Sequence, residues 1–338
     1  MKLLILATLV TLSLAGIPRP EELREEIPEP VVQHQDYGDI DPDDNLTEEE
    51  FEEVFGQDPV TDQEEKAKRE EALEKAEEEV KEENEKYLNG EADWFELINE
   101  WSDLPKDEFE AEKTGAKESH GRGLVEPEVA PVDEMSERYF SELVTRRAAT
   151  PASYSSVELG LVSPVKNQRQ CGSCVAFASM AAIETCFKKV TGGDFGDYSE
   201  QQLVDCGYQQ NGANGCDGAP SYSYIKYAAD SSLELTHEST YPYLNTDPKL
   251  TCPSTEPYNL GAKLTGSYHT YSGTEDQLKA AVAEHGAVVT SVAAAGPFSN
   301  YGGGVFSGCT SSKTDHAVTV VGYGTANGED YWLIKNSW

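Results

Sequence analysis

Residues 168–177 read QRQCGSCVAF and place Cys171 and Cys174 three positions apart. Such a pair can hold a metal ion, form a redox couple, or combine one structural cysteine with one catalytic cysteine. A structural zinc site needs four ligands, and the other cysteines are single and far apart, with no histidine pair beside them. A redox pair is expected in a βαβ context, which this region lacks. The pattern therefore favours a nucleophilic thiol.

A nucleophilic thiol needs a base close in space, and the base needs a group that orients it. His316 follows Asp315 and opens an apolar run, and Asn336 lies near the end of the sequence. A histidine at the start of a strand is more often a surface or packing residue than a catalytic one. The combination of Cys174, His316 and Asn336 is what predicts catalysis.

Charge and cysteine content differ between the two halves of the 338-residue chain, whose net charge is −36. Residues 17–150 carry 44 acidic and 15 basic side chains, which is a net charge of −29. All seven cysteines lie between positions 171 and 309, as in proteins of oxidising compartments. So acidic a chain is repelled by nucleic acid and by anionic membranes, and we expect neither as a partner.

The front of the chain predicts three segments. Residues 1–16 contain an apolar run followed by small residues, which predicts a secretory signal peptide. The run is shorter than the roughly 20 apolar residues of a membrane span. Residues 17–60 are acidic and proline-containing, which predicts disorder, with a glycosylation acceptor at Asn45. Residues 116–150 are polar, contain Arg146-Arg147, and predict an exposed linker and processing region.

A helix is predicted from Thr61, where Thr61 and Glu64 can form a capping box, to a stop at Asn89-Gly90. Its apolar stripe is narrow, so on the residues alone a docked helix and a solvated charged helix are equally open. Residues 93–104 contain two tryptophans and a phenylalanine, and predict a small packed unit.

From residue 151 the sequence is typical of a globular domain. Residues 175–191 predict a buried helix that ends at Gly192-Gly193, and residues 275–285 predict an amphipathic helix. After residue 286 come four short runs typical of strands, within 286–295, 302–308, 316–324 and 330–338. Helices followed by strands predict an α+β protein of two lobes, with an antiparallel sheet or barrel in the second.

Several further motifs follow one another in order: PVKNQRQCGSC at 164–174, GCDG at 215–218, YPY at 241–243, DHAV at 315–318, GYG at 322–324 and KNSW at 335–338. Together they resemble the papain family of cysteine proteases, of the cathepsin L-like type. The local signature of that family is Cys-Gly, then Ser or Ala, then Cys and an aromatic residue, with His and Asn downstream. The resemblance covers almost all of residues 61–338.

The resemblance implies a papain-like two-lobed fold over residues 151–338, with a helical left lobe and a right lobe like an antiparallel β-barrel. It also implies a helical inhibitory prodomain over residues 61–115. In that segment the family's helix spacing is matched at Glu65, Arg69, Leu73, Ala76, Val80 and Asn84, and a second motif at Asn99, Trp101 and Asp103. The helix is then expected to dock on its own protease.

By resemblance, Cys174 is the nucleophile, His316 the general base and acid, and Asn336 the group that holds the imidazole. Gln168 is the side-chain donor of an oxyanion hole, whose second donor is the N–H of Cys174. Trp338 shields the Asn336–His316 hydrogen bond from water. The implied protein is a monomeric endopeptidase zymogen, extracellular or lysosomal, that acts on proteins or peptides without a cofactor or metal.

The resemblance also assigns disulfides and a substrate cleft. Disulfides are implied between Cys171 and Cys216 and between Cys206 and Cys252. The residues implied to contact substrate are Gly218, Ala219, Pro220, Ser291, Ala317 and Trp338. Among these, Pro220, Ser291 and Ala317 are expected to line the pocket for the substrate residue two before the cut.

Some features depart from the family. Val175 stands where an aromatic residue is usual, and Ala219-Pro220 replaces the usual second glycine and its neighbour. The family continues beyond the KNSW motif, so we expect that the sequence is a fragment, that its last strand has a bare edge, and that the partner of Cys309 lies further on. Two alternative functions stay open: a non-catalytic papain-fold homologue, and a prodomain-type inhibitor of other proteases.

Overall fold

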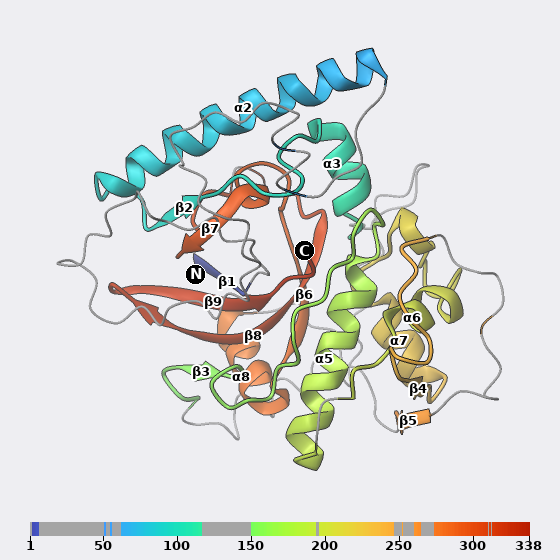
Figure 1. The fold of residues 1–338 in the computed structure, drawn as a ribbon. Coiled ribbons are helices and arrows are strands. Elements are labelled where there is room, and N and C mark those ends of the chain that lie inside the picture. Colours follow the sequence, from blue (N-terminus) through green and yellow to red (C-terminus); the bar gives the residue numbers. More distant parts are fainter. Residues whose placement is uncertain are drawn as a thin grey trace.

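The computed structural model describes residues 2–6, 51, 55, 62–116, 150–193, 196–246, 252, 260–264, 274–309, 311 and 313–338. The expected glycosylation site Asn45 and nearly all of the acidic segment and linker lie outside these residues. The described chain forms an α+β molecule of two lobes, and residues 62–116, the expected prodomain, lie across one end (Figure 1). None of its described helices has the length and apolar character to cross a membrane.

The helical lobe is built around α5 (Cys174–Thr191), whose first twelve residues are all buried. This helix ends where predicted, because Gly192 adopts the left-handed conformation with φ 67°. Helices α6 (Glu200–Cys206) and α7 (Ser223–Asp230) pack beside it, with a short 3-10 helix at Gly215–Asp217. Strands β4 (Glu234–Thr236) and β5 (Leu260–Lys263) pair antiparallel. Both expected disulfides, Cys171–Cys216 and Cys206–Cys252, are present.

The sheet lobe contains β8 (His316–Ala326), β9 (Glu329–Lys335), β6 (Val288–Val292) and β3 (Tyr154–Ser155). Strands β3, β6 and β9 all pair antiparallel with β8. Helix α8 (Glu275–His285) packs near the sheet and begins at a capping box of Thr274 and Gln277. In Figure 1, α5 runs between the sheet and helices α6 and α7, so both lobes share it as a wall. The Thr319 hydroxyl donates to the Ala178 carbonyl over 3.0 Å and ties β8 to this helix.

The edge of β9 differs from expectation. Strand β1 (Lys2–Leu6) pairs parallel with it, from Lys2 opposite Tyr331 to Leu6 opposite Lys335. In the chain that retains its first 16 residues, the edge expected to be bare is therefore covered, and the covering strand belongs to the predicted signal peptide.

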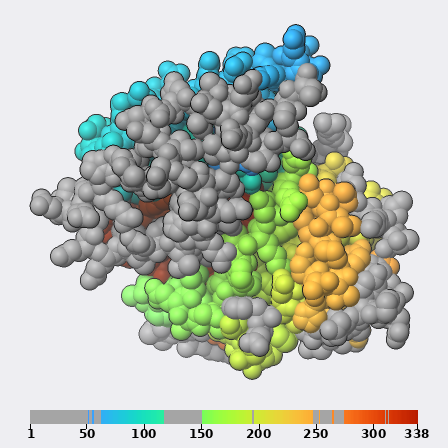
Figure 2. Space-filling view, viewed as in Figure 1, coloured from blue at the N-terminus to red at the C-terminus, as the bar shows by residue number. Residues whose placement is uncertain are grey.

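The prodomain contains α2 (Gln63–Leu88), β2 (Trp94–Glu96) and α3 (Lys106–Lys113). The predicted cap at Thr61 is wrong by one residue, since the Asp62 carboxylate accepts from the N–H groups of Glu64 and Glu65. Leu73 and Ala76 are buried, so α2 is docked rather than solvated on all sides. Figure 2 shows this helix along the outer surface of the molecule.

Two polar contacts fold the prodomain onto itself. The Arg69 guanidinium on α2 lies 2.8 Å from the fully buried Asp103 carboxylate. The Asn84 amide accepts from the Glu96 N–H over 2.9 Å and donates to the Glu96 carbonyl over 3.1 Å. Both contacts use residues that match the family's prodomain spacing.

Strand β2 docks the prodomain on the sheet lobe by pairing antiparallel with β7 (Tyr301–Gly304). The predicted strand at 302–308 therefore joins the prodomain instead of the main sheet. Trp94, Trp101 and Phe109 are buried in the same core cluster as Phe306 and Trp338. The aromatic unit expected at 93–104 is thus part of the core of the sheet lobe.

Glu96 is a buried carboxyl at this junction, 2% exposed. Burial raises its pKa to about 8, with Glu83 and Glu79 acting in the same direction and Lys86 against it. The docked state therefore holds this proton more tightly than the unfolded state does. Its contribution to stability is complete below the ordinary carboxyl pKa and is lost as pH rises through about 8.

We predict that Glu96→Gln raises the free energy of unfolding relative to the parent at pH 8.5. At pH 4.5 the substitution should give little or no such increase. The amide cannot ionise, so it escapes the loss that the carboxyl undergoes at high pH. Urea unfolding of the full chain carrying Cys174→Ala measures the difference at both pH values. The exposed Glu85→Gln on α2 is the control. An equal effect of Glu96→Gln at the two pH values would contradict the assignment.

Candidate active site

Cys174 is the first residue of α5 and is fully buried. The Ala317 N–H on β8 donates to its sulfur over 3.4 Å, so the start of the helix contacts the start of the strand. Because Cys171 is bonded to Cys216, Cys174 keeps a free thiol. The CxxC pair is therefore neither a disulfide couple nor a metal clip in this structure.

His316 begins β8 and is also fully buried. Its Nε2 donates to the Asn336 Oδ1 over 2.7 Å, and Asn336 is held by the Ser337 N–H, which donates to the same oxygen over 2.8 Å. This leaves Nδ1 as the second ring nitrogen, and it has no hydrogen-bond partner among the described residues. The Trp338 ring stacks on the imidazole with 4.5 Å between centroids. Trp338 thus covers the pair, as expected.

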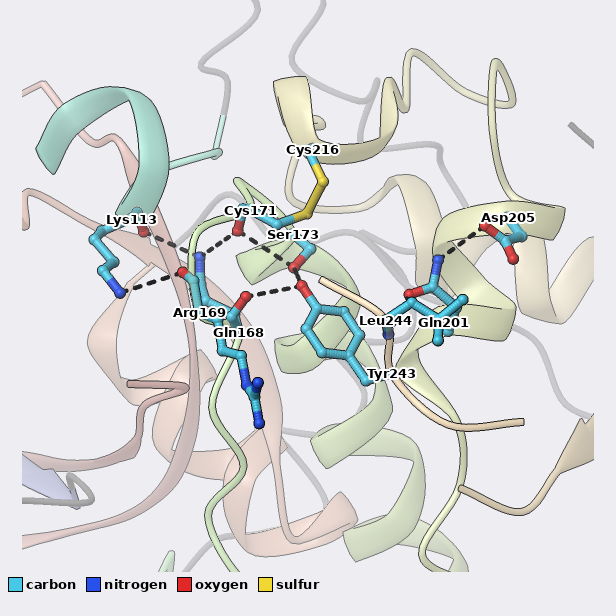
Figure 3. Close-up of a disulfide and its surroundings, with 10 residues drawn as sticks. All are labelled: Lys113, Gln168, Arg169, Cys171, Ser173, Gln201, Asp205, Cys216, Tyr243 and Leu244. Atoms are coloured by element: carbon cyan, nitrogen blue, oxygen red, sulfur yellow. Dashed lines mark hydrogen bonds between the residues drawn. A yellow bond between two sulfur atoms is a disulfide. The ribbon is translucent and has the colours of Figure 1, made fainter. Parts of the chain in front are cut away.

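Gln168 is fully buried and is held at both ends of its amide, and Figure 3 shows the hydrogen bonds at its nitrogen end. Its Nε2 donates to the carbonyls of Cys171, over 3.0 Å, and of Lys113, over 3.1 Å. Its Oε1 accepts from the Ser337 hydroxyl over 2.6 Å. These three hydrogen bonds fix the orientation of the Gln168 side chain, with its N–H₂ group toward the Lys113 carbonyl.

Buried charged groups tie β9 to the helical lobe beside Asn336. The Lys335 ammonium donates to the Ser163 hydroxyl over 2.8 Å, and that hydroxyl donates to the Glu184 carboxylate over 2.5 Å. Lys166 lies 3.6 Å from Glu184 and 3.0 Å from Glu200. These groups are paired, which is the condition for keeping charge inside a protein. They fix the position of Asn336 relative to α5.

The main chain of the prodomain runs across this site. The N–H groups of Gly115 and Ala116 both donate to the Asp315 carbonyl, and the Gly115 carbonyl accepts from the Ala219 N–H over 2.8 Å. A Cβ at Gly115 would lie 2.0 Å from the Gly172 carbonyl oxygen. A Cβ at Gly218, where φ is +91°, would lie 2.3 Å from the Gly115 carbonyl oxygen. Only glycines allow so close an approach of the two backbones.

Burial keeps the thiol and the imidazole neutral beneath this segment. It raises the pKa of Cys174 to about 12, against the N–H groups of Ala317, Gly115 and Val175, which favour the thiolate. It lowers the pKa of His316 to about 4, against the hydrogen bond to Asn336. An exposed thiol has a pKa near 8.5, and a histidine-paired one about 3–4. The covered site therefore lacks the ion pair.

Three of the residues expected to contact substrate lie against the prodomain segment, and two more are their neighbours. Gly218 and Ala219 meet Gly115, whereas Ala219 and Ala317 are buried in one cluster with Cys174 and Ala116. Ser291 lies directly opposite Ala317 in the sheet. Pro220 is half-buried and follows Ala219.

The sequence reasoning missed Ser221, whose hydroxyl forms a short hydrogen bond with that of Ser291. It also missed Lys113, whose ammonium is buried over the Trp101 ring. No motif signal marked either residue. Cys186 is a free, half-buried cysteine, because it lies beyond the fully buried turns of α5. Val175 is buried, and nothing in the structure explains why valine replaces an aromatic residue there.

Comparisons with known proteins agree with this geometry. Residues 150–338 match the model of the papain family of cysteine proteases. The chain is 35% identical over 261 residues to a cathepsin L-like proteinase of Phaedon cochleariae, covering 77% of this chain and 74% of the relative. It is 35% identical to digestive cysteine proteinase 1 of Homarus americanus, covering 77% and 75%.

Among solved structures, the digestive procathepsin L2 proteinase from the larval midgut of Tenebrio molitor superposes with a TM-score of 0.70 at 33% identity. The match covers 86% of this chain and 88% of that one. Such a neighbour accounts for both the two-lobed fold and the prodomain helix across it. The chain therefore belongs to the papain family of cysteine proteases.

Proposed function

We propose that this protein is the zymogen of an endopeptidase of the secretory pathway, extracellular or lysosomal, in which Cys174 is the nucleophile. The observation that carries the proposal is that the free thiol at the start of α5 contacts the Ala317 N–H at the start of β8, next to His316, which Asn336 orients. The apolar leader at residues 2–14 and the disulfides support the compartment. Protein or peptide chains are the substrates.

His316 acts as the base in the first step. With Nε2–H bonded to Asn336, Nδ1 carries the lone pair that takes the thiol proton from Cys174. The thiolate attacks the scissile carbonyl carbon, and the carbonyl electron pair moves onto oxygen. That oxyanion accepts hydrogen bonds from the Gln168 Nε2 and from the Cys174 N–H, which lies in the first turn of α5, where N–H groups lack acceptors within the helix.

The imidazolium then gives its proton to the leaving amine, and the C–N bond breaks to leave a thioester on Cys174. Water attacks the thioester while His316 takes its proton, and the carboxylic acid and free thiol are released. The Trp338 ring keeps water from the His316–Asn336 hydrogen bond and so preserves the ring orientation in every step.

The prodomain inhibits by crossing the site in the direction opposite to that of a substrate chain. The Lys113 carbonyl oxygen already accepts a hydrogen bond from the Gln168 Nε2. From there the prodomain runs toward Ala219, and Ala116 forms a parallel bridge with Ala219. A substrate whose residues before the cut lie near Pro220 runs the opposite way. The prodomain chain therefore binds without placing a peptide carbonyl for attack.

Low pH favours release of the prodomain through protonation of His316. Its pKa is lowered in the covered site, so the open state binds more protons as pH falls from about 6.5 toward about 4. The Lys113 main chain lies beside the ring, and Asp315 precedes it in the sequence. Glu96 acts in the reverse direction, since acid protonates and stabilises the docked prodomain there.

The direct test of the function is processing and labelling of the full-length protein. Acid treatment should yield an enzyme that hydrolyses peptides and takes up one equivalent of a thiol-directed epoxide at Cys174. Cys174→Ala should abolish both, whereas Cys186→Ala, which removes another free thiol, should retain both. A processed protein with neither hydrolysis nor labelling, identical to Cys174→Ala, would support the non-catalytic homologue instead.

A second prediction concerns the close approach at Gly115. Gly115→Ala should loosen the prodomain because its methyl would clash with the Gly172 carbonyl. Overpacking of this kind costs about 1–3 kcal/mol, so the fraction of open zymogen should rise roughly tenfold. Epoxide labelling of unprocessed zymogen at pH 7 measures that fraction. Gly193→Ala, at an open position on the surface, is the control. Equal labelling of both variants would contradict the inhibitory path.

A further inference from the structure

A tyrosine of the helical lobe is bonded to both ends of the loop that leads from Gln168 to the nucleophile. Tyr243 lies between β4 and β5, and its hydroxyl donates to the Gln168 main-chain carbonyl over 2.8 Å (Figure 3). The same hydroxyl shares a hydrogen bond of 2.7 Å with the Ser173 hydroxyl. One side chain therefore connects residue 168 with residue 173.

The two ends of this loop carry the two donors assigned to the oxyanion hole. Gln168 supplies its Nε2, and Ser173 directly precedes Cys174, whose N–H is the other donor. Ser173 is the N-cap residue of α5 but makes no side-chain cap bond with the helix, so its hydroxyl is available for Tyr243. A side chain that joins the two ends sets the distance between the donors.

The peptide that follows Gln168 is held in a strained conformation. Arg169 has a φ of 53°, in the left-handed region that residues other than glycine rarely adopt. Both polar groups of this peptide are fixed, because its carbonyl accepts from Tyr243 and its N–H donates to the Asn167 Oδ1 over 2.7 Å. Such a conformation persists only where its surroundings enforce it. Loss of the Tyr243 hydroxyl would let this peptide relax and turn the Gln168 side chain.

Tyr243 is itself fixed in place. Its ring packs edge-on against Phe177 of α5, with 4.8 Å between the centroids. Its N–H donates to the Glu238 carboxylate over 2.7 Å, and the N–H of Leu244 donates to the Gln201 Oε1 over 3.0 Å. Burial raises the pKa of the Tyr243 hydroxyl, so this group stays protonated and able to donate at acidic and neutral pH.

We propose that Tyr243 is a positioning residue for the oxyanion hole, whose hydroxyl sets the Gln168 side-chain donor relative to the Cys174 N–H. Tyr243 touches no reacting atom and acts through the loop that it closes. This inference rests on the proposed endopeptidase function and adds a residue to its machinery. It concerns only the steps in which a carbonyl oxygen gains charge, because those are the steps that the two donors stabilise.

The first test compares hydrolysis with alkylation in the processed full-length enzyme. Tyr243→Phe should leave KM nearly unchanged and lower kcat by roughly tenfold, a part of the roughly 10²–10³-fold that loss of a whole oxyanion donor costs. Iodoacetamide reacts at a saturated carbon and forms no oxyanion, so its rate with Cys174 should match the parent rate between pH 5 and 8. Tyr241→Phe is the matched control and should leave kcat unchanged, because the Tyr241 hydroxyl donates to the Asp205 carboxylate instead.

The outcomes of this test separate the inference from the function on which it rests. A kcat of Tyr243→Phe equal to that of the parent would overturn the inference and leave the proposed function intact. An alkylation rate that falls as far as kcat would also overturn it, since the change would then have damaged the nucleophile or the fold. A parent enzyme with neither hydrolysis nor epoxide labelling would overturn the proposed function itself.

The second test asks whether Tyr243 acts through Gln168. A Gln168→Ala enzyme lacks the side-chain donor, so adding Tyr243→Phe should change its kcat by less than about twofold, as expected for two residues that act as one unit. A further loss as large as the loss in the parent would contradict the proposal.

A third variant tests the same peptide if Tyr243→Phe does not fold. Asn167→Ala frees the N–H end of the peptide between Gln168 and Arg169 and leaves Tyr243 unchanged. We expect a lower kcat with parental alkylation of Cys174. A parental kcat would overturn the proposal, because the orientation of this peptide would then not set the donor.

Discussion

The contact between the first residue of α5 and the beginning of β8 is the constraint on which the site depends. Cys174 comes from the helical lobe, and His316, Ala317 and Asn336 come from the sheet lobe, so no single lobe contains the chemistry. The Ala317 N–H holds the sulfur against the strand over 3.4 Å. The Lys335 ammonium on β9 donates to the Ser163 hydroxyl, which donates to Glu184 on α5, so separating β9 from α5 would leave a buried charge without a partner.

The prodomain controls this junction by excluding water from it. Its main chain bonds to Asp315 and Ala219 and covers a thiol and an imidazole that need solvent or each other to ionise. The raised pKa of Cys174 and the lowered pKa of His316 are two results of the same burial. In the proposed function, inhibition combines a steric block with suppression of the thiolate–imidazolium pair, and release of the segment restores both access and charge.

Much of this arrangement could be predicted from the sequence. The buried helix, its glycine stop and the strands follow from local patterns, whereas the grouping of Cys174, His316, Asn336 and Gln168 required the family resemblance. The Ser221–Ser291 pair and the buried Lys113 could not be predicted, because each depends on how two lobes or two chain segments meet. The strand pairing of β1 with β9 and of β2 with β7 is non-local for the same reason. Local propensity does not encode which edge a strand will join.

We infer that the covering prodomain holds Cys174 as a neutral thiol. The most direct measurement is the rate of alkylation of Cys174 by iodoacetamide from pH 4 to 9, followed by mass spectrometry in intact zymogen and processed enzyme. The exposed thiol of Cys309 serves as the internal reference. In the processed enzyme we expect Cys174 to be alkylated rapidly, at a rate that varies little between pH 5 and 8. In the zymogen we expect a much slower rate that rises with pH over the whole range. Matching rates and pH profiles for Cys174 in the two forms would contradict it.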